Sequence, residues 1–201
     1  MFTIKNTVDD LVDNSISIVE QIFEPELLQL LFDEILEIEA EDDLQNAKIG
    51  RLDQNILYQK IRSDKIKWLE GNTKAQKLLF EKLENIRIEL NKNLMLGLFD
   101  FETHFAVYKN GDFYKKHFDS FRGDKNRIIS MVIYLNKNWQ ESDGGVLNIY
   151  KNIEDLKPEF SVAPKWGNAV FFLSEEVPHE VAISNKTRYS IAVWFRVRDI
   201  I

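Results

Sequence analysis

Apolar side chains recur every three or four residues in two segments of the first half of the chain. The first segment opens at Glu24-Pro25 and carries its apolar stripe at Leu27, Leu28, Leu31, Ile35 and Ile38. The second follows the capping-box sequence from Thr73 to Gln76 and continues through Ala75, Leu79, Leu83, Ile86, Leu90 and Leu94. This spacing predicts two amphipathic helices, and we expect the longer one to pack against the outside of a sheet.

From Phe99 onward the apolar residues recur at every second position, which predicts strands. About eight strands are expected, at residues 101–109, 113–119, 127–136, 146–151, 160–163, 169–173, 179–183 and 188–197. A short strand at 15–19 and a strand-like segment at 55–61 precede them. Asn110-Gly111 predicts one hairpin turn, and residues 184–186 predict a second hairpin between the last two strands.

Short strands with frequent turns, and helices confined to the first half, predict an α+β fold in which a two-sheet jelly roll is supported by N-terminal helices. With 201 residues, 44% of them hydrophobic, the chain has the size of one domain. We expect residues 1–201 to form that domain, with helical support over 1–95 and the strand-rich core over 96–201.

The charge balance narrows the choice of partners. A net charge of −7 and a pI near 5.1 argue against nucleic acid or an anionic membrane surface as the main partner. Because the chain has no cysteine, disulfides and thiolate metal sites are excluded, and a reducing compartment is favoured. The first ten residues lack the apolar core of a signal peptide, so we expect a cytoplasmic protein. The acidic segment at 37–43 lacks calcium-loop spacing and is interpreted as a solvated helix end.

Candidate metal chemistry lies in the strand-rich half. On an extended strand His117 and Asp119 project from the same face, which provides two ligands. The third metal ligand is either His104 or His179. His104 has no acidic residue two positions later, so we interpret it as a strand residue near the site and favour His179. The alternative is a surface strand with two structural histidines.

The position of Arg188 suggests which chemistry this site performs. The expected second hairpin would bring its guanidinium back beside the metal. Two histidines and one carboxylate on one face of an octahedral ion leave positions open, an arrangement that suits non-haem Fe(II) oxygenases. An arginine nearby suits a cosubstrate with a distal carboxylate. The hypothesis is therefore a 2-oxoglutarate-dependent Fe(II) dioxygenase.

The chain resembles the prolyl hydroxylase domain family, which contains the hypoxia-sensing enzymes and their bacterial relatives. The resemblance is carried by the run 108–119 and by Arg127, Tyr134-Leu135-Asn136, Trp139, Gly144-Gly145-Val146-Leu147, Pro164, Phe171-Phe172, Pro178-His179-Glu180-Val181, Arg188-Tyr189 and Trp194. Upstream, residues 61–71 resemble the family's substrate-facing loop. Ser63 replaces a usual glycine there, and Ala192 stands where hypoxia-sensing members carry a threonine.

This resemblance implies a double-stranded β-helix and a protein prolyl hydroxylase that oxidises 2-oxoglutarate to succinate and CO2 with O2. It implies Fe(II) held by His117, Asp119 and His179, and 2-oxoglutarate bound by Arg188, Tyr134 and Tyr108. The substrate cleft would be formed by Arg62, Asp64, Tyr114, Arg127 and Trp194. For Tyr114, packing within the strand is the alternative role. Ascorbate is left open as a further cofactor.

The chain looks most like the bacterial members, for which elongation factor Tu is the leading candidate substrate. Two alternatives remain open. One is a dioxygenase that acts on a free amino acid or another small molecule, and the other is a non-catalytic jelly-roll binding protein.

Overall fold

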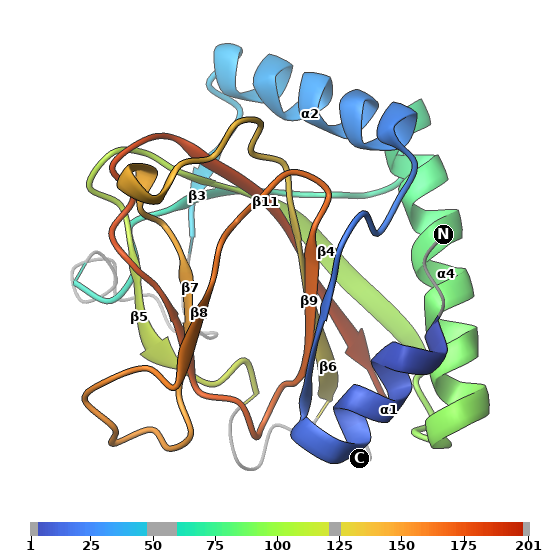
Figure 1. The fold of residues 1–201 in the computed structure, drawn as a ribbon. Coiled ribbons are helices and arrows are strands. Elements are labelled where there is room, and N and C mark those ends of the chain that lie inside the picture. The colour runs from blue at the N-terminus through green and yellow to red at the C-terminus, as the bar shows by residue number, and fades with distance from the viewer. Residues whose placement is uncertain (1–3, 48–59, 121–125, 199–201) are drawn as a thin grey trace.

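Two antiparallel sheets face each other in the computed structural model, which describes residues 4–47, 60–120 and 126–198 (Figure 1). The seven-stranded sheet has the order β1-β9-β6-β11-β4-β3-β2, and the four-stranded sheet has the order β5-β10-β7-β8. The larger sheet comprises β1 (Ile16–Val19), β2 (Gln45–Asn46), β3 (Lys65–Trp68), β4 (Asp100–Tyr108), β6 (Arg127–Tyr134), β9 (Ala169–Leu173) and β11 (Arg188–Arg196). The smaller comprises β5 (Tyr114–His117), β7 (Leu147–Ile149), β8 (Phe160–Val162) and β10 (His179–Val181).

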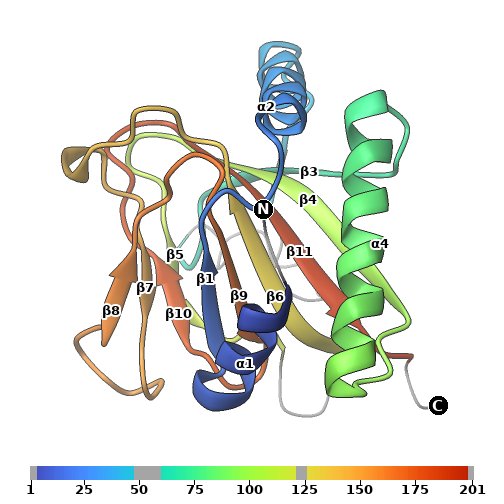
Figure 2. The same ribbon diagram turned by 45° about the vertical axis from the view of Figure 1, so that its right-hand side comes forward.

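Helices cover the outer face of the larger sheet. They are α1 (Ile4–Asn14), α2 (Pro25–Ala40) and α4 (Lys74–Leu94), and a short 3-10 helix, η1, spans Glu141–Asp143. Figure 2 shows α4 running beside β4 and β11, on the side of the sheet away from β7 and β8. The expected jelly roll with N-terminal helical support is therefore confirmed, and so are the two amphipathic helices.

The N-terminus of α4 departs from the expected reciprocal capping box. Thr73 Oγ1 accepts a hydrogen bond from the backbone N–H of Gln76 at 3.1 Å, as expected. The Gln76 side chain, however, does not return to Thr73. Its Oε1 instead accepts the backbone N–H groups of Glu70, Gly71 and Asn72, so that one amide oxygen orders the turn that joins β3 to α4.

Alternation along three adjacent strands divides the interior into two parts. Phe105 of β4, Met131 of β6 and Ile191 of β11 point toward the helices and join their leucines in one core. Tyr108 and Tyr134, at positions of the opposite parity, belong to a second cluster between the sheets. The large sheet is thus buried on both faces, since one face carries the helical support and the other lines the space inside the roll.

All eight expected strands of the second half are present, but both expected hairpins are wrong. β4 pairs with β11 and β3, whereas β5 pairs with β10, so the Asn110-Gly111 turn carries the chain from one sheet to the other. The segment at 184–186 likewise connects β10 in the small sheet to β11 in the large one. Turn chemistry predicted the change of direction but not the change of sheet.

The acidic segment at 37–43 is solvated as expected at Glu37, Glu41, Asp42 and Asp43, and Glu39 is the exception. The Glu39 side chain is only 17% exposed, accepts a hydrogen bond from the Tyr189 hydroxyl and pairs with Lys109, so it ties α2 to the end of the sheet. The strand-like segment expected at 55–61 lies outside the described residues up to position 59. None of the described helices is both long and apolar enough to span a bilayer.

Replacing Leu83 with alanine tests the core between helix and sheet. Leu83 is fully buried in α4, so Leu83→Ala should lower the free energy of unfolding by about 3 kcal/mol, measured by urea denaturation. Ile88→Ala is the matched control, because Ile88 is 37% exposed on the same helix and should lose less than about 1 kcal/mol. Equal losses in the two variants would show that α4 is not packed as described.

Candidate active site

A cavity of about 350 Å³ opens between the two sheets. The large sheet contributes side chains from β3, β4, β6 and β11, and the small sheet contributes side chains from β5, β7 and β10. Most of its wall is apolar or aromatic, and the ionisable groups are gathered at a few points. A cavity of this size and composition suits a small-molecule site.

His117 and His179 face each other across neighbouring strands of the small sheet. The antiparallel register of β5 and β10 places the two residues directly opposite, and their ring centroids are 4.3 Å apart. His117 Nδ1 donates to Lys115 O at 2.7 Å, and His179 Nδ1 donates to Val177 O at 3.0 Å. Because carbonyl oxygens only accept, both rings carry their proton on Nδ1 and leave Nε2 free to coordinate a metal.

Asp119 completes the group from a bend beyond the end of β5. Strand β5 ends at His117, so the in-strand argument for His117 and Asp119 does not describe the local backbone. The backbone N–H of Asp119 instead donates to Ser174 O at 3.1 Å, and its Oδ2 accepts from Ser130 Oγ at 2.6 Å. Ser130 and Ser174 are themselves hydrogen-bonded at 2.9 Å. These contacts orient the carboxylate toward the imidazoles.

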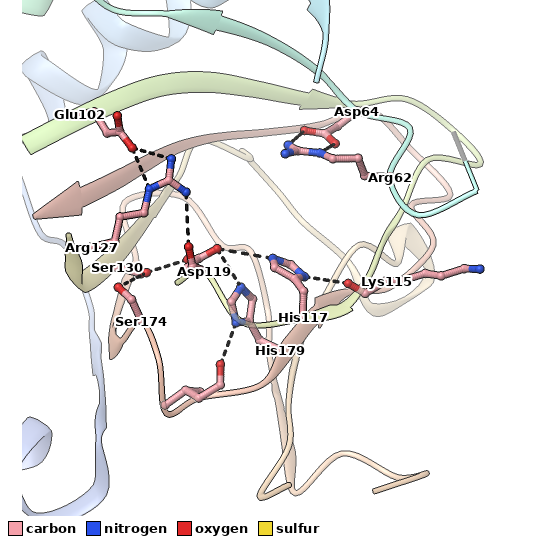
Figure 3. A network of polar contacts seen from close by, with 11 residues as sticks. Arg62, Asp64, Glu102, Lys115, His117, Asp119, Arg127, Ser130, Ser174 and His179 are labelled. Carbon is pink, nitrogen blue, oxygen red and sulfur yellow. Dashed lines mark hydrogen bonds and ion pairs between the residues drawn. The ribbon is translucent and has the colours of Figure 1, made fainter. Parts of the chain in front are cut away.

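The three side chains converge on one point (Figure 3). Asp119 Oδ1 lies 3.4 Å from His117 Nε2 and 3.7 Å from His179 Nε2, and the three potential ligand atoms all lie within 4.8 Å of one another. His104 is not part of this group. The structure places His179 with His117 and Asp119, and it places His104 in the wall of the same cavity.

Burial sets the protonation of the group. Burial, together with the nearby His117, lowers the pKa of His179 to about 4, so its imidazole is neutral at physiological pH. Burial alone would raise the pKa of Asp119, but the two imidazoles and the Ser130 hydroxyl outweigh it and hold the pKa below its ordinary value. With both Nδ1 protons directed at carbonyls, the site presents two imidazole Nε2 atoms and one carboxylate, the donor set that suits a divalent iron with open positions.

A buried cation lies deeper in the same cavity. Arg188 is 4% exposed, and its guanidinium donates to Gly145 O and to Ser190 Oγ, each at 2.9 Å. Among the described residues no carboxylate lies within salt-bridge distance of it, and the hydroxyl of fully buried Tyr134 has no hydrogen-bond partner. The guanidinium carbon lies 5.2 Å from the Tyr134 ring centroid and 4.9 Å from that of Tyr108. A buried guanidinium beside an unpartnered hydroxyl is suited to a carboxylate ligand.

Two further arginines line the same cavity. Arg62 donates to both carboxylate oxygens of Asp64, at 2.8 and 2.6 Å, and Asp64 is 1% exposed. Arg127 pairs with Glu102, and its guanidinium carbon lies 3.9 Å from a ring centroid of Trp194. Both charges are therefore neutralised by partners and stacked on aromatic rings.

The residues predicted from the sequence are thus brought together. Nine of the eleven line the cavity, Asp64 contacts it through Arg62, and Tyr134 lies beside Arg188. Sequence reasoning missed Ser130, Gly145, Ser174 and Ser190, which hold Asp119 or Arg188 or support the residues that do, and Trp68, which adjoins Trp194. Ser130 could have been found, since it lies two and four positions before Val132 and Tyr134 on the same strand face.

A two-sheet jelly roll with two histidines and a carboxylate facing one cavity defines a non-haem oxygenase architecture. Residues 103–196 match the sequence model of the 2OG-Fe(II) oxygenase superfamily. A crystal structure of a Pseudomonas putida prolyl-4-hydroxylase matches 98% of this chain and 100% of that chain, with 36% identity and a TM-score of 0.86. The chain therefore belongs to the 2OG-Fe(II) oxygenase superfamily and, within it, to the prolyl hydroxylases.

Other relatives agree with this placement. A prolyl hydroxylase from Trichoplax adhaerens, in complex with a hypoxia inducible factor oxygen degradation domain peptide fragment, matches 94% of this chain and 86% of that chain at 25% identity and a TM-score of 0.82. Human Egl nine homolog 1 is 34% identical over 144 residues, or 67% of this chain. The chain spans 33% of the length of that protein.

The buried histidine outside the triad should make the protein sensitive to acid. Burial lowers the pKa of His104 from about 6.5 to about 4, so the folded state binds a proton less readily than the unfolded chain and stability falls as the pH drops through this window. Between pH 7.5 and 5.0 we expect His104 alone to cost about 2 kcal/mol. Urea denaturation at both pH values should show a smaller loss for His104→Met than for the unchanged protein, and equal losses would contradict the assignment.

Proposed function

We propose that the chain is a 2-oxoglutarate- and Fe(II)-dependent protein prolyl hydroxylase. The observation that carries this proposal is that the metal-ligand group and the unpaired Arg188 lie in one cavity, so a single small molecule can contact both. A jelly-roll binding protein would have no need of a ligand group with both Nδ1 atoms committed to carbonyls. The non-catalytic alternative is therefore disfavoured.

His117, Asp119 and His179 would hold Fe(II). Their chemistry fits the metal because two imidazole Nε2 atoms and one carboxylate oxygen leave coordination positions open. The backbone carbonyls set the tautomers of the two imidazoles, and Ser130 orients the Asp119 carboxylate.

Arg188 would bind the distal carboxylate of 2-oxoglutarate, and the Tyr134 hydroxyl would donate a hydrogen bond to the same carboxylate. Burial raises the pKa of Tyr134 to about 12, so the hydroxyl keeps its proton and can donate. Tyr108, whose ring lies beside Arg188, would pack along the cosubstrate. In a water-poor cavity this ion pair is stronger than it would be in solvent.

Fe(II), 2-oxoglutarate and O2 together supply the oxidant that inserts oxygen into a C–H bond, while 2-oxoglutarate is released as succinate and CO2. The protein's part is to position the reactants and to exclude water from them. The apolar wall formed by Ala106, Val132, Leu147 and Val181 keeps water away from the reacting groups. The substrate would be contacted by Arg62, Asp64, Tyr114, Arg127 and Trp194.

A prolyl residue in a protein is the substrate that we infer. Trp68 is 45% exposed at the cavity and adjoins His104 and Trp194, which provides an aromatic surface suited to a proline ring and its flanking residues. The resemblance to bacterial members makes elongation factor Tu our lead candidate. We also propose one dioxygenase domain over 1–201, with 1–95 as support and substrate loop and 96–201 as core, in a cytoplasmic enzyme.

Hydroxylation can be tested directly by mass spectrometry. Purified protein with Fe(II), 2-oxoglutarate and O2, with and without ascorbate, should form succinate and add one oxygen atom to a proline of elongation factor Tu. His179→Ala should abolish both products, because two ligands cannot replace three. Oxygen added only to free proline would support the small-molecule alternative, and metal binding without succinate would support a binding protein.

Replacing Arg188 tests the cosubstrate site separately. Arg188→Gln should raise the KM for 2-oxoglutarate at least about tenfold, because a buried charge pair would be lost. Lys186→Gln is the matched control, since Lys186 is 60% exposed two positions earlier and should leave KM unchanged. Succinate formation at varied 2-oxoglutarate provides the measurement. An unchanged KM in Arg188→Gln would remove this assignment.

A further inference from the structure

The ring of Tyr114 lies flat against one of the proposed metal ligands. Its centroid is 3.6 Å from that of His117, and the two ring planes differ by 16°. The guanidinium carbon of Arg62 lies 4.3 Å from the same tyrosine centroid. Because His117 covers one face of the phenol ring, the guanidinium lies over the other. Asp64, Arg62, Tyr114 and His117 thus form a continuous column that leads from a buried carboxylate to the metal-ligand group.

His117 depends on this support more than its counterpart does. The His179 side chain is 5% exposed and packs against Phe172 of the large sheet, with a centroid distance of 4.5 Å. The His117 side chain is 14% exposed, and its closest ring contact is Tyr114. One hydrogen bond to Lys115 O leaves the imidazole free to rock about that bond, whereas a stacked ring fixes its plane.

The backbone reinforces the column. Ser63 donates to Phe113 O at 3.1 Å, and Lys115 donates to Ile61 O at 2.8 Å, so the segment that carries Arg62 pairs with the start of β5. The guanidinium is therefore tied to the phenol ring both through its side chain and through the main chain. A displacement of Arg62 would be transmitted to Tyr114.

We propose that Tyr114 is a positioning residue that fixes the imidazole plane of His117, and that Arg62 acts on the metal site through Tyr114. This inference rests on the proposed function and adds to the substrate-contact role expected for both residues. A molecule that binds against Arg62 would then change the orientation of the His117 imidazole. By linkage, a bound metal would also order the segment that carries Arg62.

Co(II) titration of the purified apoprotein, monitored by its visible absorption, tests the proposal without substrate. Tyr114→Phe keeps the ring and should bind Co(II) within about twofold of the unchanged protein. Tyr114→Leu removes the stack and should bind Co(II) roughly tenfold more weakly, with an altered absorption band. Arg62→Met should weaken binding a few-fold, but only where Tyr114 is present, because its effect passes through that ring.

Trp68→Leu is the matched control, because it removes an aromatic ring from the same cavity wall without touching a ligand, and it should leave Co(II) affinity unchanged. Circular dichroism melts of the metal-free variants check that each is folded. Tyr114→Leu binding Co(II) like the unchanged protein, or Arg62→Met having the same effect in both backgrounds, would overturn the inference. Failure of the unchanged protein to bind Co(II) would instead count against the proposed function.

Discussion

The alternation of side chains along β4, β6 and β11 is the constraint on which the rest of the structure depends. Each of these strands is buried on both faces, so a residue's parity decides whether it packs against α4 or enters the cavity. Phe105 and Ile191 belong to the helix-facing core, whereas Tyr108 and Arg188 line the inside of the roll. A one-residue slip in register would exchange the two sets and remove both the core and the site.

The polar groups of the cavity are held by contacts that satisfy them only in part. Nδ1 of each triad histidine is bound to a carbonyl, and one oxygen of Asp119 is bound to Ser130, while the atoms that face the cavity are left for a ligand. Arg188 follows the same pattern. Its guanidinium donates to Gly145 O and Ser190 Oγ, but no carboxylate among the described residues neutralises its charge. Such incomplete satisfaction is expected where a site is organised before its ligand arrives.

The sequence was most informative where local chemistry decides structure. The spacing of apolar residues identified α2, α4 and the eight strands of the second half, and the family motifs identified the cavity residues. Sheet membership was not predictable, because the turns at 110–111 and 184–186 fit a hairpin and a crossing equally well. The support around Asp119 was also missed, since Ser174 is 55 positions away and only the folded chain brings the two together. Gly145 was identified as part of a family motif, and the folded chain shows that a Cβ there would lie 3.0 Å from Arg188 Cδ.

The tethering of Asp119 gives the proposed iron a mechanical role. Both histidines belong to the small sheet, whereas Asp119 is fastened through Ser130 of β6 and through Ser174, which directly follows β9, and both strands belong to the large sheet. An ion bound by all three would therefore link the two walls of the roll. Loss of the ion would remove this link and leave the apolar cluster between the sheets to hold the two walls together.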